Sequence, residues 1–269
     1  EALKAAGCVA YWPMTETDGT VFSEVIGKGL PALHLRQKGT TGTATLAGAP
    51  GLPIDDAAPV LSLEASGSSG YFVDAPNQIT LPETFAVGVF FDGSASVVDG
   101  EPILELALSG VVLWVWHNTD GSVHIKEVRN GALVVGTPIA TGVTGPAVVL
   151  LYVTHEVDTG LNKIYYHCTA GTPVGSSTGR LANFIYSSAK LTIGAAPAAA
   201  ASAGRGFTGT PPALLADKLT VGHAFLLTGE LGSTPRTKLV DTLSELTTLS
   251  ADDRIEQWYG WAGESQTVA

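Results

Sequence analysis

The stretch that decides the fold covers residues 111–138 and reads VVLWVWHNTDGSVHIKEVRNGALVVGTP. It holds three apolar runs, at residues 111–117, 123–129 and 132–138. Between them stand NTDGS and RNGA, and Asp-Gly and Asn-Gly supply the positive φ that tight β-hairpins require. The stretch therefore predicts a meander of three antiparallel strands.

Apolar runs of this kind, bounded by Gly, Pro, Asn and Asp, recur from residue 8 to about residue 228. The predicted strands are 9–12, 70–74, 84–91, 103–108, 111–117, 123–129, 132–138, 147–155, 162–169, 190–193 and 218–227. Short strands with little helix are typical of sandwiches and barrels. We therefore predict an all-β fold, a two-sheet antiparallel β-sandwich, with residues 147–155 and 162–169 as a second antiparallel pair.

Two segments depart from the strand pattern. Residues 194–212 are rich in Ala, Gly and Pro without periodicity, which predicts a long loop and a candidate contact arm. In residues 237–262 Leu239, Val240, Leu243 and Leu246 follow helical spacing, and Ser250 with Asp253 forms a helix start signal. We expect two short C-terminal helices packed on a sandwich that forms a single domain, residues 1–269.

The charge and composition narrow the classes of partner. The formal net charge is -11, and charged residues make up only 14% of the chain, against roughly 25% in typical soluble domains. A weakly polar surface suits a protein that packs against neighbours or is held in a particle. The acidic excess argues against nucleic acid, which is bound largely through Lys and Arg. No run approaches the roughly 20 apolar residues of a membrane helix, so we expect no membrane insertion.

The chain has two cysteines, Cys8 and Cys168, far apart in the sequence. Two cysteines do not make a disulfide framework, so we expect two buried thiols. A disulfide is the alternative if their strands are neighbours.

The opening CVAYWPMTETDGT, residues 8–20, resembles the first strand and loop of the concanavalin A-like lectin and glucanase superfamily, in particular its laminin-G-like and pentraxin-like jelly rolls. Further segments resemble this group in the same order along the chain: residues 70–91, 111–125, 147–177, 190–197 and 218–231. The resemblance spans nearly the whole chain and implies a jelly-roll sandwich.

The tail LSADDRIEQWYGWA, residues 249–262, resembles a helix that follows such jelly rolls in structural proteins of bacteriophages, although Tyr259 and Gly260 stand in the reverse of the usual order. This implies a virion protein, such as a capsid decoration or a fibre component, whose partners are other virion proteins, surface polysaccharide or further copies of itself in a homo-oligomer. The alternative is a secreted, extracellular bacterial lectin-like domain that binds carbohydrate.

Glucanases of this superfamily carry acidic residues on alternate positions of one strand, because two carboxyl groups must flank one glycosidic bond. The nearest pattern here is EPILEL, which places Glu101 and Glu105 on one side of a strand. Ile103 stands where the pattern has Asp, and Pro102 marks the start of the strand. We therefore expect solvated carboxylates at a strand edge, no catalytic residues and no enzyme. A polysaccharide hydrolase or lyase acting through these carboxylates is the distant alternative.

Trp114 and Trp116 stand two apart on one predicted strand and so face the same way. They form either a stacking platform for sugar rings or part of the aromatic core between the sheets, and the apolar flanks favour the core. The pair is nevertheless our candidate glycan-binding site. We expect Trp12, Trp258 and Trp261 to pack the two ends of the chain onto the sandwich.

The histidines fall in no metal-binding spacing, and no serine lies in a Gly-x-Ser-x-Gly elbow. We expect His117 and His124 to meet across a hairpin as a surface pair. The remaining histidines are His34, His155, His167 and His223. None of the six suggests a zinc site.

Many relatives of the resembled group bind calcium through loop oxygens, which here are represented by Asp18, Asp74, Asn77, Asp120 and Asp158. Turn formation explains most of these residues, and no Asp-x-Asp-x-Asp loop is present. We expect no cofactor, keep calcium as the alternative and name no metal ligand.

Overall fold

The computed structural model describes residues 8–12, 21–22, 35–39, 43–45, 61–64, 71–74, 81, 84–95, 99–109, 111–129, 132–156, 161–174, 177–181, 185–194 and 218–228. These residues form strands, turns and one short 3-10 helix, η1 (Gly93–Ala95). The predicted helices in 237–262 and nearly all of the loop 194–212 lie outside them. In the described ranges, no helix has the length and apolar character needed to cross a membrane.

The first sheet has eight strands, all paired antiparallel. In spatial order they are β15 (Ser177–Leu181), β13 (Leu161–Cys168), β12 (Pro146–Glu156), β7 (Phe85–Asp92), β17 (Lys218–Thr228), β5 (Leu61–Glu64) and β4 (Thr43–Thr45), with β1 (Cys8–Trp12) also paired to β17. The predicted pair of residues 147–155 and 162–169 is confirmed as β12 and β13.

The second sheet has nine strands, again all antiparallel. Their order is β14 (Thr172–Pro173), β11 (Ala132–Thr141), β10 (Val123–Arg129), β9 (Val111–His117), β8 (Glu101–Ser109), β16 (Ile185–Ile193), β6 (Tyr71–Asp74), β3 (Leu35–Gly39) and β2 (Val21–Phe22). The predicted meander is confirmed as β9, β10 and β11.

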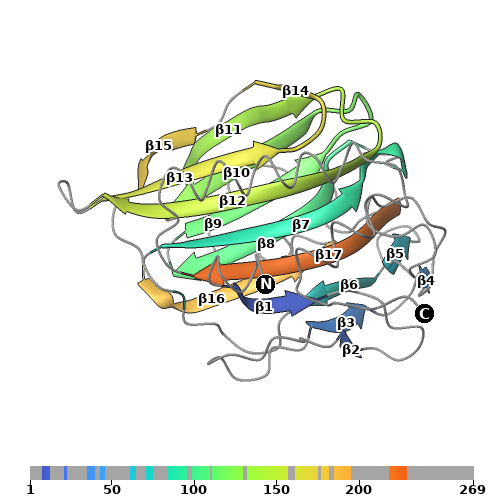
Figure 1. Cartoon of the computed structure of the whole chain (residues 1–269), viewed down its shortest axis with the longest axis horizontal. Coiled ribbons are helices and arrows are strands. Elements are labelled where there is room, and N and C mark those ends of the chain that lie inside the picture. The colour runs from blue at the N-terminus through green and yellow to red at the C-terminus, as the bar shows by residue number, and fades with distance from the viewer. Residues whose placement is uncertain are drawn as a thin grey trace, which may run out of the picture.

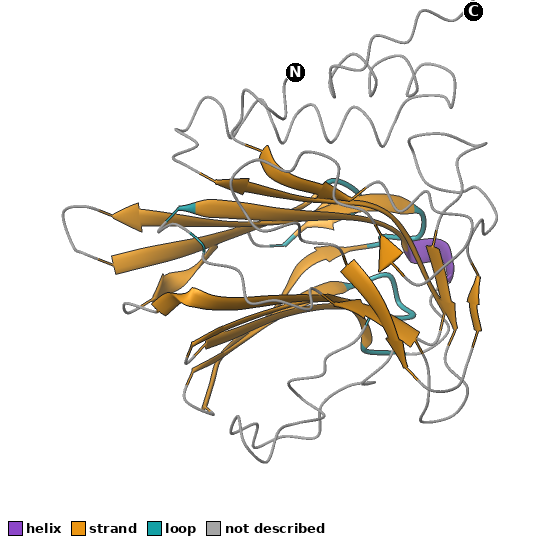
Figure 2. Ribbon diagram, turned by 90° about the horizontal axis from the view of Figure 1, so that it is seen from below, coloured by secondary structure: helices purple, strands orange, loops and turns teal. Residues whose placement is uncertain are grey.

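The two sheets lie face to face as two layers (Figures 1 and 2). The predicted fold class, an all-β antiparallel sandwich, is confirmed, and each predicted strand is present, with the largest shift at β16, which begins at Ile185 and not at residue 190. The strands that the sequence did not predict are β2, β3, β4, β5, β14 and β15, each two to five residues long. They are too short or too polar for a periodicity signal.

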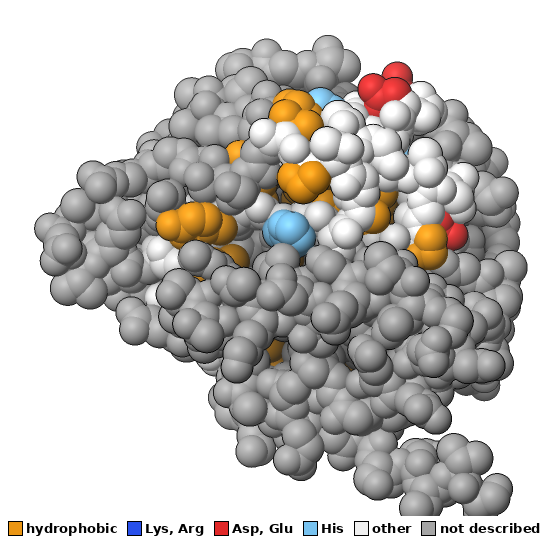
Figure 3. All heavy atoms as spheres, turned by 45° about the horizontal axis from the view of Figure 1, so that its top comes forward, with side chains coloured by type: hydrophobic (Ala, Val, Ile, Leu, Met, Phe, Trp, Pro, Cys, Tyr) orange, Lys and Arg blue, Asp and Glu red, His pale blue; other side chains and the backbone are white. Residues whose placement is uncertain are grey.

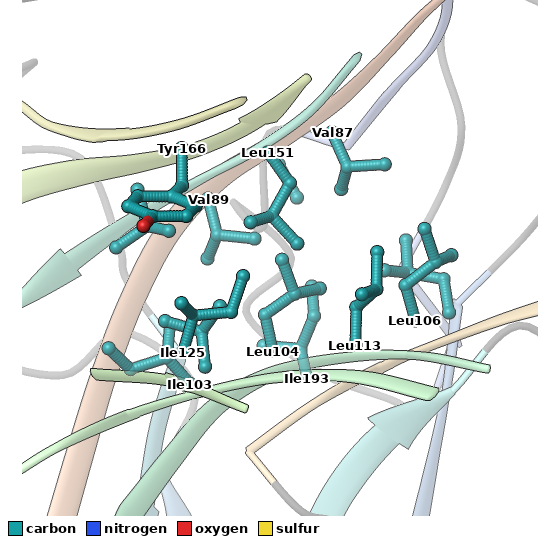
Figure 4. Close-up of a cluster of buried hydrophobic side chains, with 14 of the residues drawn as sticks. Val87, Val89, Ile103, Leu104, Leu106, Leu113, Ile125, Leu151, Tyr166 and Ile193 are labelled. Carbon is teal, nitrogen blue, oxygen red and sulfur yellow. The ribbon is translucent and has the colours of Figure 1, made fainter. Parts of the chain in front are cut away.

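An apolar core fills the space between the sheets (Figure 4). Along β9, Leu113 and Val115 point into this core, and on the facing sheet Val87, Val89 and Leu151 meet them. This alternation is the expected result of the two-residue side-chain period of a strand. Trp12 is fully buried as expected, whereas Trp258 and Trp261 lie outside the described residues.

The two cysteines are buried and form no disulfide, as expected. Cys8 lies on β1 and Cys168 on β13, and the strands β17, β7 and β12 separate them within one sheet. Four strand spacings amount to about 19 Å, well beyond the roughly 7 Å that a disulfide can span between Cα atoms.

Candidate functional site

The two candidate tryptophans lie on the outer face of the nine-stranded sheet, the face turned away from the other sheet. Their neighbours Leu113 and Val115 point into the core, so the side chains of Trp114 and Trp116 point outward. Trp114 is 0% exposed, as expected of a core residue, but it lies on the outer face and not between the sheets. Trp116 keeps part of its surface exposed. Of the pair, only Trp116 can meet a ligand as the chain stands.

Trp116 belongs to a short row of aromatic rings. His124 lies opposite it on β10, and the two rings stack with centroids 5.2 Å apart and planes 10° apart. Trp114 follows on the same strand, tilted by 53° at 5.6 Å from Trp116. Such contacts are worth about 0.5–1.5 kcal/mol per pair beyond burial, so the Trp116 ring is held in one orientation.

A chain of hydrogen bonds connects this row to the hairpin between β9 and β10. The hydroxyl of Ser122 accepts from His124 Nε2 at 2.9 Å and from Asn118 Nδ2 at 3.0 Å, and it donates to Asp120 Oδ1. Asp120 is exposed. We call Asn118, Asp120, Ser122, His124 and Trp116 the hairpin site.

The charges of the hairpin site follow from these contacts. The Ser122 hydroxyl bonded to Asp120 lowers the pKa of that carboxyl below 3.8, so it is an anion at neutral pH. Burial lowers the pKa of His124 below 6.5, an effect that the nearby Asp120 opposes. The site therefore presents a carboxylate and a neutral imidazole beside an indole.

The hairpin holds its shape through its own backbone. Gly121, with φ of 78°, donates to the carbonyl of Asn118 at 3.0 Å, and the amide of Asn118 donates to the carbonyl of Ser122 at 2.9 Å. The positive φ explains why the Asp-Gly pair stands here. Asp99 adds a second support, because its Oδ1 accepts from both the amide and the hydroxyl of Thr119.

The loop 141–145, which we call the Val143 loop, ties the hairpin to the neighbouring turns. The amide of Val143 donates to Gly121 O at 2.8 Å, and the amide of Gly93 donates to Gly145 O at 3.0 Å. A Cβ on Gly93 would lie 2.8 Å from Val143 O, and one on Gly171 would lie 2.4 Å from Thr141 O. Glycine is required where these turns approach so closely.

His117 and His124 do not meet, so the expected surface pair is wrong. The partner of His117 is Val123, whose side chain is in the core, whereas His124 lies opposite Trp116 on the outer face. His117 is buried, donates from Nε2 to Val143 O at 2.8 Å and packs against Phe91. Burial lowers its pKa below 6.5.

The expectation of solvated carboxylates at Glu101 and Glu105 is also wrong. The two residues are 0% and 2% exposed, and their strand β8 lies inside the sheet, between β9 and β16. A bulge between Pro102 and Leu104 shifts the register, so Glu101 lies opposite His117 while Glu105 lies opposite Trp114. Residues opposite each other share a face. The two carboxylates therefore occupy opposite faces and cannot flank one glycosidic bond.

Ser122 is not arranged as a nucleophile. An activated serine gives its proton to a histidine that a carboxylate orients. Here Ser122 lies between His124 and Asp120, and its proton points to the carboxylate. The network can hold a hairpin or receive hydrogen bonds from a ligand.

In the described part of the chain, no group of three or more His, Cys, Asp or Glu side chains could hold a metal ion. Of the loop oxygens considered for calcium, Asp120 lies in the hairpin, and Asp74 ends strand β6 and is not in a loop. Asp18, Asn77 and Asp158 lie outside the described residues. So does His34, whereas His155, His167 and His223 lie on strands β12, β13 and β17.

Comparison with solved structures finds proteins that share this fold. The chain is similar to a Trypanosoma rangeli sialidase in complex with 2,3-difluorosialic acid, with 13% identity and a TM-score of 0.54 over 91% of this chain and 34% of that one. It is similar to the binding domain of botulinum neurotoxin DC in complex with rat synaptotagmin II, with 12% identity and a TM-score of 0.51 over 90% of this chain and 52% of that one.

A third similar structure is botulinum neurotoxin type C, whose cell entry is described as dependent upon interaction with two ganglioside molecules; the identity is 10% and the TM-score 0.50, over 90% of this chain and 52% of that one. This chain thus spans about half or a third of the lengths of these structures. At such identities the likeness shows the two-sheet fold alone. No protein-family model and no curated protein sequence matches the chain.

The sequence pointed to Trp116 and Asp120 separately but did not predict that they belong to one site. The signal that could have done so is the hairpin register. With NTDGS as a tight turn, Trp116 and His124 stand at opposite positions, and Ser122 lies two residues before His124. No feature of the sequence indicated that the Trp114 side chain is buried on this outer face.

Proposed function

We propose that this chain is a non-enzymatic recognition module, an accessory protein of a bacteriophage virion that binds surface glycans or other virion proteins. The observation that carries the proposal is the hairpin site, in which a partly exposed indole is connected through His124 and Ser122 to an exposed carboxylate. Sugar rings are recognised by an aromatic face together with polar groups placed to fix orientation.

Support for a binding role also comes from the way the site is held. The Val143 loop and the hairpin are joined by backbone hydrogen bonds and by the His117 side chain, so the site needs little ordering when a ligand arrives. Preorganisation of this kind increases affinity because less conformational entropy is lost on binding. Figure 3 shows hydrophobic, histidine and acidic side chains on one face of the molecule, among backbone and other side chains.

The absence of catalysis is part of the proposal. Glu101 and Glu105 lie on opposite faces, and Ser122 donates to a carboxylate, so neither arrangement matches a hydrolytic centre. The virion assignment is supported by the likeness of residues 249–262 to phage structural proteins and by the low charge of the chain.

The binding role is tested with Trp116→Ala on a glycan array. We expect this variant to lose at least tenfold in affinity for any glycan that the native chain binds. Tyr165→Ala is the matched control, since Tyr165 is a partly exposed aromatic on the outer face of the other sheet, against Tyr152. Equal loss in both variants, or no loss in Trp116→Ala, contradicts a role for the hairpin site.

The virion role is tested separately by electron microscopy of particles from the source, labelled with antibody against this chain. Label on the particle surface is the expected result. The second candidate is a secreted lectin-like domain, which the same hairpin site favours. It predicts label on cells or in the medium and no label on the particles. Glycan binding that disappears with a chelator would make that lectin calcium-dependent.

A further inference from the structure

Strand β11 is an open edge of the nine-stranded sheet. It pairs with β10 along its length, but on its other side β14 pairs only with Ala140 and Thr141. Within the described part of the chain, no strand pairs with that side from Ala132 to Thr137. In Figure 1, β11 and β14 lie along the upper margin of the molecule. Six residues of backbone, about 20 Å, thus present one row of amide and carbonyl groups away from β10.

The other described edge strands are shorter than β11: β1 has five uncharged residues, and β15 has five and carries Arg180. β2 has two residues, β4 has three and β14 has two, and short edge strands offer little to pair with. β11 has ten residues, ALVVGTPIAT, with no charged side chain among them. Charge is one means by which an edge strand discourages pairing, and β11 lacks it, although it carries Pro138 and two bulges in its pairing with β10.

An exposed apolar side chain lies at the same edge. Val174 directly follows β14, and its amide donates to Ile139 O on β11 at 3.0 Å. The Val174 side chain is 53% exposed, and it is the one large hydrophobic side chain among the described residues that is exposed.

From these observations we infer that β11 pairs antiparallel with β11 of a second copy of this chain, joining two nine-stranded sheets into one continuous sheet. An antiparallel pair of identical strands is self-complementary about a two-fold axis, which is the commonest symmetry of homo-oligomers. A second copy also suits the charge, because a chain of net charge -11 can approach itself best through an uncharged strand.

The pairing would give the module two ligand sites, a consequence that rests on the proposed function. A two-fold axis perpendicular to the sheet leaves both outer faces on the same side. Trp116 on β9 lies two strands from the edge, so the two copies of the hairpin site would be five strand spacings apart, about 24 Å measured across the strands. Two sites on one rigid sheet raise the avidity for a repeating glycan or a virion surface.

Sedimentation velocity of the full chain at neutral pH, over a range of concentrations and without ligand, tests the inference. We expect a dimer that dissociates on dilution. Gly136→Lys places a charge on β11, at the position opposite Lys126, and should weaken dimerisation at least tenfold. Thr43→Lys on β4, an edge of the other sheet, is the matched control and should remain dimeric. A monomeric native chain, or equal dimerisation of both variants, overturns the inference.

Hydrogen exchange on the native chain keeps the test decisive if Gly136→Lys fails to fold. The amides of residues 132–137 should exchange more slowly at high than at low protein concentration, and exchange independent of concentration overturns the pairing. Glycan binding is read out separately. A folded Gly136→Lys monomer should keep the affinity of a single site for glycan but bind a dense glycan surface at least tenfold more weakly. Loss of binding in Trp116→Ala alone bears on the proposed function and not on the pairing of β11.

Discussion

Gly88 shows how one missing side chain makes room for another. It lies within β7, opposite Phe225 of β17, and a Cβ at this position would stand 2.1 Å from Phe225 Cζ. Phe225 is fully buried, with the edge of its ring toward Phe90 at 6.5 Å, so the ring has little space in which to shift. Glycine at residue 88 is therefore a packing requirement of the neighbouring strand.

Gly88→Ala should destabilise the protein by about 2 kcal/mol, because overpacking a closely packed site forces side chains from their preferred rotamers. Chemical denaturation measures the change. Gly145→Ala is the control, since no atom lies within 4 Å of a Cβ built there, and its effect should stay within about 0.5 kcal/mol. Equal stability of the two variants would contradict this account of Phe225.

Cys168 should be chemically inert in the folded protein. Burial raises the pKa of its thiol to about 11, so almost none of the reactive thiolate exists at pH 8. We expect iodoacetamide at pH 8 to label Cys168 only after denaturation, which mass spectrometry of the digested protein detects. Rapid labelling of the native chain would mean that β13 opens readily.

Among the elements, the β9–β10 hairpin and the Val143 loop depend on each other through His117. Its imidazole donates to Val143 O while packing on Phe91 of the facing sheet. A carbonyl oxygen can only accept a hydrogen bond, so Nε2 of His117 carries the proton. The ring is neutral in the folded state because burial lowers its pKa. One side chain thereby couples a loop, a hairpin and the core.

This coupling predicts a pH dependence of stability. The unfolded chain protonates His117 near pH 6.5, whereas the folded chain resists protonation until a lower pH. The stabilisation is therefore complete above about pH 6.5 and is lost as the pH falls through the folded pKa. Urea denaturation between pH 7.5 and 5 should show a steeper loss of unfolding free energy for the native chain than for His117→Gln, which keeps a donor that does not titrate. Parallel pH profiles would refute this role.

For the molecule as a unit, stability should come from the sandwich core and not from a bound ion. The core is apolar and draws on both sheets, and no group of potential metal ligands occurs in the described residues. We expect the thermal melting temperature to be the same with 1 mM calcium and with excess chelator. A calcium site occupied at 100 times its Kd would add about 2.7 kcal/mol, a shift of several degrees that calorimetry would detect. Such a shift would establish calcium as a cofactor.

The local pattern of residues was enough to predict the longer strands and the two hairpins. Each of these depends on short-range properties: a run of β-branched and aromatic residues makes a strand, and Asp-Gly or Asn-Gly provides the positive φ of its turn. The many short strands and the resemblance to jelly rolls both predicted the two-sheet arrangement, which the structure confirms. The single domain of residues 1–269 and the C-terminal helices remain predictions.

Which face each functional side chain occupies depended on packing across the whole chain. The bulge near Pro102 adds one residue to β8, and because side chains alternate with a period of two, one extra residue sends Glu101 and Glu105 to opposite faces. The register of the hairpin likewise turns His117 inward and His124 outward. Among the described residues, β11 is unpaired on its far side from Ala132 to Thr137 because β14 is short. These features depend on how the strands pair and where the bulges fall, which the order of residues along the chain does not fix by itself.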